Sequence, residues 1–273
     1  MQPLDERFTH CQFGPHAPRV LRLGFSASYR PGADVVRRAL DAGINFLFCY
    51  GWDQQMIRVL RELSPAQRQQ CVIATGAFNF RLGRPNLRKT LEKRLRQLRT
   101  DYIDVFLFLG VMKPAHFPPD LREELRKLKE DGKVLAVGMS CHDRRFAGQL
   151  AAARELDVLM VRYNAAHRGA EEEVFPHVGP DGPRIISYTA TCWRRLLRRP
   201  REWPRHRPVP DAAMCYQFAL SHPAVDVCLT APSNVEQLQE NLRALEQGPL
   251  SDEEMAFMRE FGDVVHRRGA WFM

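Results

Sequence analysis

The chain has 273 residues, of which 45% are hydrophobic and 26% are charged, values that are ordinary for a globular domain. The longest apolar run, Val105 to Met112, is far shorter than the roughly 20 residues that cross a bilayer, so no membrane partner is expected. Seven scattered cysteines without a C-x-x-C pair, and an N-terminus without an apolar signal stretch, predict reduced thiols in a cytoplasmic protein.

Short apolar runs alternate with longer amphipathic segments along the chain, which is typical of βα units around a parallel sheet. Eight runs are predicted as strands: Val20–Ser26, Ile44–Cys49, Cys71–Gly76, Tyr102–Leu109, Val134–Ser140, Val158–Tyr163, Arg184–Thr189 and Val225–Thr230. Eight such units predict a single α/β domain over residues 1–273, a (β/α)8 TIM barrel whose function lies at the C-terminal ends of the strands. Within it we distinguish an N-terminal extension (1–19), an Arg- and Pro-rich loop (192–210) and a C-terminal helix and tail (251–273).

Several intervening helices carry recognisable boundary signals. The helix from Asp34 is expected to end at Gly43, a residue suited to a left-handed C-terminal position. Leucines at helical spacing place one apolar face on residues 86–98, and a further helix is predicted over 121–130. Ser233 is predicted to cap a helix over 235–246, and residues 251–254 (SDEE) form a capping box that opens the last helix.

Four segments in the same order resemble the aldo-keto reductase superfamily. They are residues 41–46 (DAGINF), 98–107 (LRTDYIDVFL), 125–140 (LRKLKEDGKVLAVGMS), and 218–223 (FALSHP) with 231–241 (APSNVEQLQEN). The resemblance implies the same barrel, and hydride transfer between NADP(H) and a carbonyl group. In this family an Asp, Tyr, Lys and His at the barrel mouth act together, with the tyrosine as general acid.

The resemblance also implies that most of this catalytic set is replaced. The aspartate position holds Phe48, the lysine position Gly76 and the histidine position Leu109. Tyr50, followed by Gly51, resembles the catalytic tyrosine but arrives about three residues too early in the loop. Because loss of one such helper costs about 10²–10⁴ in rate, ordinary carbonyl reduction is expected to be impaired. Tyr50 is the one inherited acid that we predict, with His142 as a weaker candidate.

The cofactor positions implied by the resemblance are partly kept. At the nicotinamide end, the Ser-Asn pair reads Ser140-Cys141 and a glutamine is replaced by Met160, whereas Tyr188 matches the tyrosine that stacks on the ring. At the adenosine-phosphate end, four residues share one helix face at the expected offsets, near a helix N-terminus suited to phosphate. These are Ser233, Gln237, Glu240 and Asn241. The sequence thus leaves two alternatives: retained NADP(H) binding, or a helix that has lost its ligand.

Two other clusters admit more than one interpretation. Cys49, Cys141 and Cys192 follow strands, and with His142 they suggest a thiol–imidazole or zinc site; the interpretation we favour is small apolar filling, with no metal. The segment Arg194–Arg207, between Trp193 and Pro208, has three possible interpretations: it binds the phosphates of a cofactor, it binds an anionic partner, or it is a solvated surface loop. It contains no known nucleic-acid-binding module, so nucleic acid is not an expected partner.

The sequence therefore predicts a divergent aldo-keto reductase, NADP(H)-linked by descent, that takes a small-molecule ligand at the barrel mouth. The alternative is a non-catalytic binding or regulatory protein, a pseudoenzyme that uses the same pocket or the Arg-rich loop. Trp271 and Phe272 near the C-terminus are interpreted either as a cover over the mouth, as a helix end packed on the barrel, or as a subunit contact.

Overall fold

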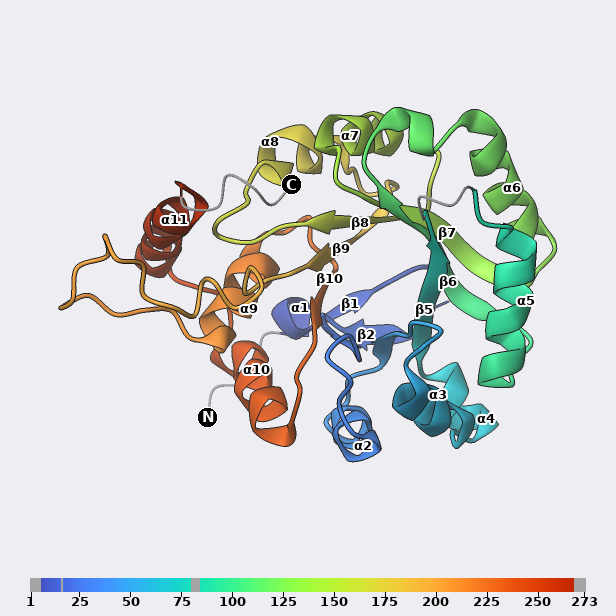
Figure 1. Cartoon of the computed structure of the whole chain (residues 1–273), viewed down its shortest axis with the longest axis horizontal. Coiled ribbons are helices and arrows are strands. Elements are labelled where there is room, and N and C mark those ends of the chain that lie inside the picture. Colours follow the sequence, from blue (N-terminus) through green and yellow to red (C-terminus); the bar gives the residue numbers. More distant parts are fainter. Residues whose placement is uncertain (1–5, 16, 80–83, 268–273) are drawn as a thin grey trace.

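A computed structural model describes residues 6–15, 17–79 and 84–267, and it shows a closed eight-stranded parallel barrel surrounded by helices (Figure 1). The predicted TIM-barrel fold is confirmed. Trp271 and Phe272 lie outside the described residues. The barrel strands, in chain order, are β3 (Leu23–Ser26), β4 (Phe46–Phe48), β5 (Val72–Phe78), β6 (Ile103–Val111), β7 (Val134–Cys141), β8 (Val158–Arg162), β9 (Arg184–Tyr188) and β10 (Val227–Thr230). The barrel closes where β10 pairs with β3.

Helices follow the strands and form the outer layer of the barrel (Figure 1). Their apolar faces turn inward, as the leucine spacing of residues 86–98 predicts: Leu87, Leu91 and Leu98 are buried and Leu95 is partly buried. The helices are α1 (Glu6–Thr9), α2 (Ala33–Asp41), α3 (Gln54–Arg61), α4 (Pro65–Gln69), α5 (Leu87–Leu98), α6 (Pro119–Glu130), α7 (Arg144–Ala153), α8 (Ala170–Glu173), α9 (Ala212–Ser221), α10 (Val235–Gln247) and α11 (Asp252–Arg267), with 3₁₀ turns η1 (Pro114–His116) and η2 (Phe175–His177).

Two boundary predictions need correction. The run 20–26, predicted as one strand, is divided at Arg22 into β2 (Arg19–Leu21) and β3, because the backbone changes partner there: the Arg22 amide donates to Thr9 and the Arg22 carbonyl accepts from Cys228 of β10. β2 pairs antiparallel with β1 (His10–Gln12), which lies inside the segment predicted as an N-terminal extension. Ser233 does not cap α10; Asn234 does, since its side chain accepts a hydrogen bond from the Gln237 amide.

Carboxylates tie the N-terminal ends of adjacent barrel strands together. Asp104, Asp157 and Asp226 each accept a hydrogen bond from a backbone amide of the preceding barrel strand, at 2.9, 2.9 and 2.6 Å. Each also pairs with a cation, the least exposed pair being Asp104 with Arg68 at 2.7 Å. Because each acid bridges two strands, these contacts fix the register at the end of the barrel opposite the mouth.

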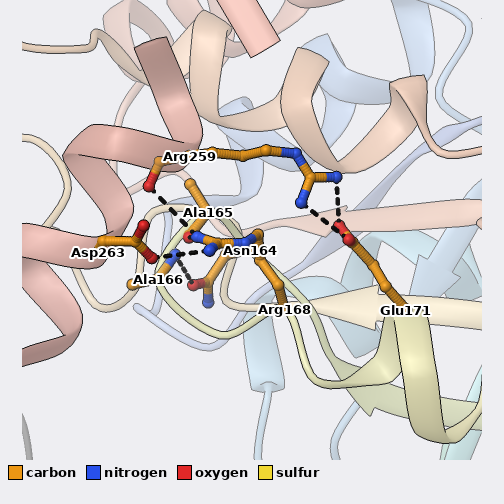
Figure 2. A network of polar contacts seen from close by, with 7 residues as sticks. All are labelled: Asn164, Ala165, Ala166, Arg168, Glu171, Arg259 and Asp263. Atoms are coloured by element: carbon orange, nitrogen blue, oxygen red, sulfur yellow. Dashed lines mark hydrogen bonds and ion pairs between the residues drawn. The ribbon is translucent and has the colours of Figure 1, made fainter. Parts of the chain in front are cut away.

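The C-terminal helix α11 is held against α8 and against the loop between β8 and α8 (Figure 2). Arg259 of α11 makes two 2.9 Å contacts with the Glu171 carboxylate, and Arg168 pairs with Asp263 at 2.7 Å. A Cβ atom on Gly262 would lie 2.1 Å from a carbonyl oxygen of this loop, so only glycine permits the close approach. This helix is therefore fixed beside the barrel mouth by both charge and backbone contact.

Replacing Arg99 with glycine is expected to raise the free energy of unfolding by about 0.5–1 kcal/mol. Arg99 ends α5 in the left-handed conformation, φ 53° and ψ 50°, which penalises a Cβ atom. The matched control is Arg96→Gly, an exposed position within the same helix, where glycine is expected to lower stability by about 1 kcal/mol. Urea denaturation measures the free energy of unfolding of both variants, and a loss of stability in both would contradict the prediction for Arg99.

Candidate functional site

A cavity of about 510 Å³ lies at the C-terminal ends of the barrel strands, where the fold predicts function. Its walls come from the ends of β3, β9 and β10, from the loops after β4 and β9, and from the N-terminal halves of α9 and α10. Six of the seven predicted site residues line it; Ser140 is not among them. The described lining residues are Ser26, Ser28, Tyr29, Tyr50, His142, Met160, Tyr188, Thr189, Ala190, Thr191, Trp193, Arg194, Leu197, Ala212, Tyr216, Leu229, Ala231, Ser233, Gln237, Glu240 and Asn241.

The barrel interior beneath this cavity is apolar. Phe48 and Leu109 are buried in one cluster of interior side chains that also includes Met160 and Leu229. A Cβ atom on Gly76 would lie 2.1 Å from the Leu107 carbonyl oxygen and 3.0 Å from Leu109 Cγ, so the backbone and Leu109 fill the space of a side chain there. These three positions contribute no ionisable group, and apolar packing takes up the volume that such groups would need.

Tyr50 is half-buried, and its hydroxyl interacts with the hydroxyl groups of Ser28 and Ser26. The two serine oxygens are themselves 2.7 Å apart. Burial raises the pKa of Tyr50, the Asp53 carboxylate raises it further, and the hydrogen bonds from the serines oppose the shift. The net upward direction leaves the phenol neutral and a poor proton donor near neutral pH.

The short loop that carries Tyr50 is held by polar contacts and by ring stacking. Asp53 accepts a hydrogen bond from the Tyr50 amide at 2.9 Å, and Gln97 of α5 donates to the Gly51 carbonyl at 3.1 Å. The Tyr50 ring stacks on Trp52 with centroids 4.9 Å apart and planes only 6° from parallel. Burial raises the pKa of Asp53. Because Asp53 accepts its hydrogen bond from the Tyr50 amide, its carboxylate orients the loop through the backbone.

His142 and Tyr188 form another part of the cavity wall. The Tyr188 hydroxyl lies 3.5 Å from His142 Nε2, and the two rings pack edge to face. Burial, with Arg162 nearby, lowers the pKa of His142 and favours the neutral imidazole. Ser140, one residue before the end of β7, accepts a hydrogen bond from the Gly110 amide at 2.9 Å.

The predicted residues of α10 are partly committed to contacts within the protein. Gln237 accepts a hydrogen bond from the Ser233 amide at 2.9 Å, and Glu240 accepts one from the Ala212 amide at 3.4 Å. Asn241 is buried and donates to Thr230 Oγ1 at 2.7 Å. Ser233 is the exposed residue of this set, whereas Gln237 and Glu240 are half-buried.

The Arg-rich segment divides into inward and outward arginines. Arg207 pairs with Glu260 of α11 and lies 4.3 Å from the ring centroid of buried Trp203, which itself packs on Phe261. Arg195 and Arg199 donate to backbone carbonyls. The segment therefore packs along α11 (Figure 1). The guanidinium groups of its outward arginines are exposed and have no hydrogen bond or ion pair with the described residues; these are Arg194, Arg198, Arg201 and Arg205.

The cysteines that follow strands do not form one cluster. Cys141 donates to the Asp143 carbonyl at 3.1 Å, and Cys192 lies 3.7 Å from His167 Nδ1, so the observed thiol–imidazole contact does not involve His142. Burial raises the pKa of Cys141 to about 12, and it raises the pKa of Cys49 and Cys192 as well. Within residues 6–15, 17–79 and 84–267, no group of three or more His, Cys, Asp or Glu side chains is arranged to hold a metal ion.

Six polar residues of the cavity wall were not predicted from the sequence: Ser26, Ser28, Tyr29, Thr189, Thr191 and Tyr216. Ser26 ends β3 and Ser28 and Tyr29 follow it, so the rule that function lies at and just after the strand ends would have found them. Tyr216 lies in α9 and reaches the cavity only through the packing of that helix, which no local pattern in the sequence indicates.

Comparison with known proteins agrees with this architecture. The sequence profile of the Aldo/keto reductase family matches residues 26–198 and 190–263. The NADH-specific methylglyoxal reductase of Escherichia coli (strain K12) is 23% identical over 288 residues, covering 86% of this chain and 88% of that protein. Aldo-keto reductase YhdN of Bacillus subtilis (strain 168) is 25% identical over 184 residues, covering 60% of this chain and 53% of its own length.

Solved structures share the fold. The holo form of aldo-keto reductase AKR11C1 from Bacillus halodurans superimposes with a TM-score of 0.75 at 22% identity, covering 93% of this chain and 96% of that one. The aldo/keto reductase from Klebsiella pneumoniae in complex with NADP and acetate gives a TM-score of 0.70 at 20% identity, covering 90% and 92%. In the described part of the chain, no helix is both long and apolar enough to span a bilayer.

The buried His167 predicts a pH dependence of stability. Burial, with Arg162 nearby, lowers its pKa from 6.5 to about 4. Between these values the unfolded chain binds a proton that the folded chain does not, so stability falls as the pH decreases through this window. His167→Gln is expected to reduce this loss by up to about 3 kcal/mol, measured by urea denaturation at pH 7 and pH 4.

The exposed His206 provides the matched control. His206→Gln is expected to keep the pH profile of the unmodified protein, because the substitution changes an exposed side chain and removes no buried contact. If His167→Gln left the dependence of stability on pH unchanged, His167 would not be the source of the loss of stability at low pH.

Proposed function

We propose that this chain, which belongs to the aldo/keto reductase family, is a divergent NADP(H)-linked oxidoreductase by descent whose ordinary carbonyl reduction is impaired. The observation that supports the proposal is the apolar interior beneath the cavity, which holds Phe48, Gly76 and Leu109. The sequence resemblance implies that these residues occupy the positions of the family's Asp, Lys and His. A family member that keeps the Asp, Lys and His would have three groups at these positions that assist proton transfer.

The state of Tyr50 supports impaired catalysis. A phenol with an ordinary pKa near 10 needs a neighbouring cation to become an effective acid at neutral pH. The groups that act on Tyr50 are two hydroxyls and a carboxylate, and burial raises its pKa. Loss of a single proton-transfer helper costs about 10²–10⁴ in rate, so loss of three leaves little catalysis by this route.

The cavity walls fit a nucleotide cofactor. Tyr188 offers a ring face for the nicotinamide, and the N-terminal end of α10, with Ser233 and Gln237, offers amides and side chains for the adenosine phosphate. Glu240 and Asn241 support this wall through their bonds to Ala212 and Thr230, and Ser140 remains a predicted partner of the carboxamide. When bound, the reduced cofactor would supply a hydride to a substrate carbonyl.

The alternative function is a non-catalytic binding or regulatory protein. The exposed arginines of the segment 194–207 favour an anionic partner, since they are not paired with carboxylates of the described residues. Binding of such a partner through surface arginines would weaken steeply as the salt concentration rises. Cofactor binding without turnover of any carbonyl compound would likewise favour this alternative.

NADPH is expected to bind and to quench tryptophan fluorescence in a titration. Tyr188→Ala is expected to weaken that binding by about 5–10-fold, because it removes a ring contact. Glu246→Ala, at the exposed C-terminal end of α10, is the control that keeps the affinity. No binding at millimolar NADPH would contradict the cofactor assignment.

Carbonyl reduction is expected to be slower than in a complete family member by at least about 10⁴-fold, measured as NADPH oxidation over a panel of aldehydes and ketones. Tyr50→Phe is expected to leave the residual rate almost unchanged, since the phenol is a poor acid in this environment. Rapid turnover that Tyr50→Phe abolishes would show instead that the acid still works, and would overturn the proposed impairment.

A further inference from the structure

Tyrosines gather in the cavity wall. Four of the six tyrosines of the chain line this one cavity, at positions 29, 50, 188 and 216. Trp193 joins them, whereas no phenylalanine of the described residues lines it. Tyrosine combines a flat apolar face with a hydroxyl, so a wall of tyrosines suits ligands that have both ring faces and polar substituents.

The mouth also holds most of the exposed aromatic surface. The large hydrophobic side chains exposed among the described residues are Tyr29 (53%), Trp52 (50%), Trp193 (41%) and Leu135 (39%). Tyr29 and Trp193 line the cavity, and Trp52 stacks on Tyr50. Exposed rings gathered at one opening indicate a binding surface more than chance exposure.

The inner end of the cavity is neutral. Among the described lining residues only Arg194 and Glu240 carry a formal charge, and both belong to the outer wall, on the segment after β9 and on α10. The inner wall contributes Met160 and Leu229 from the apolar interior. No lining residue at this end carries a charge, so a charged group placed against it would lose its water without a counter-ion in the wall, which is costly. Arg162 acts on His142 and Tyr188 but is not a lining residue.

Polar contacts at the inner end are hydrogen-bonding groups. The Tyr50, Ser26 and Ser28 hydroxyls lie together. Elsewhere in the lining, the buried Nδ1 of His142 has no hydrogen-bond partner among the described residues. A ligand hydroxyl or carbonyl can form a hydrogen bond with these hydroxyl groups, whereas the buried Nδ1 of His142 is not accessible from the cavity.

We infer that the cavity binds a neutral, planar aromatic molecule that carries a hydroxyl or carbonyl group on its ring. This ligand would occupy the same cavity as the proposed function, and the inference rests on the proposed function only in taking that cavity as the functional site. Ring faces of Tyr29 and Trp193 contact the ligand, and the cluster of the Tyr50, Ser26 and Ser28 hydroxyls binds its polar group.

The test compares three probes of similar size by isothermal titration calorimetry, with and without NADPH. They are 2-naphthol, its saturated counterpart decahydro-2-naphthol, and the anion 2-naphthoate. We expect 2-naphthol to bind at least about 10-fold more tightly than either of the others. Equal affinity for the saturated probe, or tighter binding of the anion, would overturn the inference.

Variants locate the contact. Tyr29→Ala and Trp193→Ala are each expected to weaken 2-naphthol binding by about 3–10-fold, as loss of one ring contact predicts. Leu135→Ala, which removes a similarly exposed apolar side chain at the start of β7, is expected to leave the affinity unchanged. An effect of Leu135→Ala as large as that of the ring variants would overturn the assignment to this cavity.

The two proposals fail separately in this design. Binding of 2-naphthol without any binding of NADPH would overturn the cofactor assignment and support the ligand class. Binding of NADPH without 2-naphthol in either condition would overturn the ligand class and leave the cofactor assignment standing.

Discussion

Apolar side chains, among them Phe13, Phe46 and Leu109, fill the inside of the barrel, and the chemistry of the cavity depends on this filling. The interior must be packed for the barrel to be stable, because its strands present alternate side chains inward. In this chain the packing continues toward the mouth, where Phe48 ends β4 and Leu109 lies near the end of β6. A charged group there would have to be buried among hydrocarbon side chains, at a cost that only a matched partner could offset.

This packing leaves Tyr50 in an unusual position for an acid. Its ring is held between aromatic neighbours, and its loop is fixed by Asp53, but its hydroxyl meets serine hydroxyls in place of a cation. The same arrangement that weakens proton donation makes the inner cavity neutral and aromatic. Impaired reduction and affinity for neutral rings, the two proposals made for this site, would therefore both follow from the proposed exchange of charged for apolar residues.

The outer wall of the cavity follows a different principle. α11 is fixed to α8 and to the loop between β8 and α8 by ion pairs, and the Arg-rich segment packs along α11 through Trp203 and Arg207 (Figure 2 shows the first of these contacts). Arginines that a sequence shows as one cluster thus serve two purposes. Some hold the segment to the protein, and others, such as Arg194, face the cavity or solvent.

The sequence by itself determined the barrel, because strand and helix periodicities repeat eight times and the family motifs occur in order. The proposed replacement of three catalytic positions also rests on the sequence, since Phe48, Gly76 and Leu109 can be read from strand ends. Only the tertiary structure decided that Tyr216 lines the cavity and that Cys192 meets His167 in place of His142. Local patterns fix which residues share a strand or a helix face, but contacts between side chains from distant elements depend on how those elements pack together.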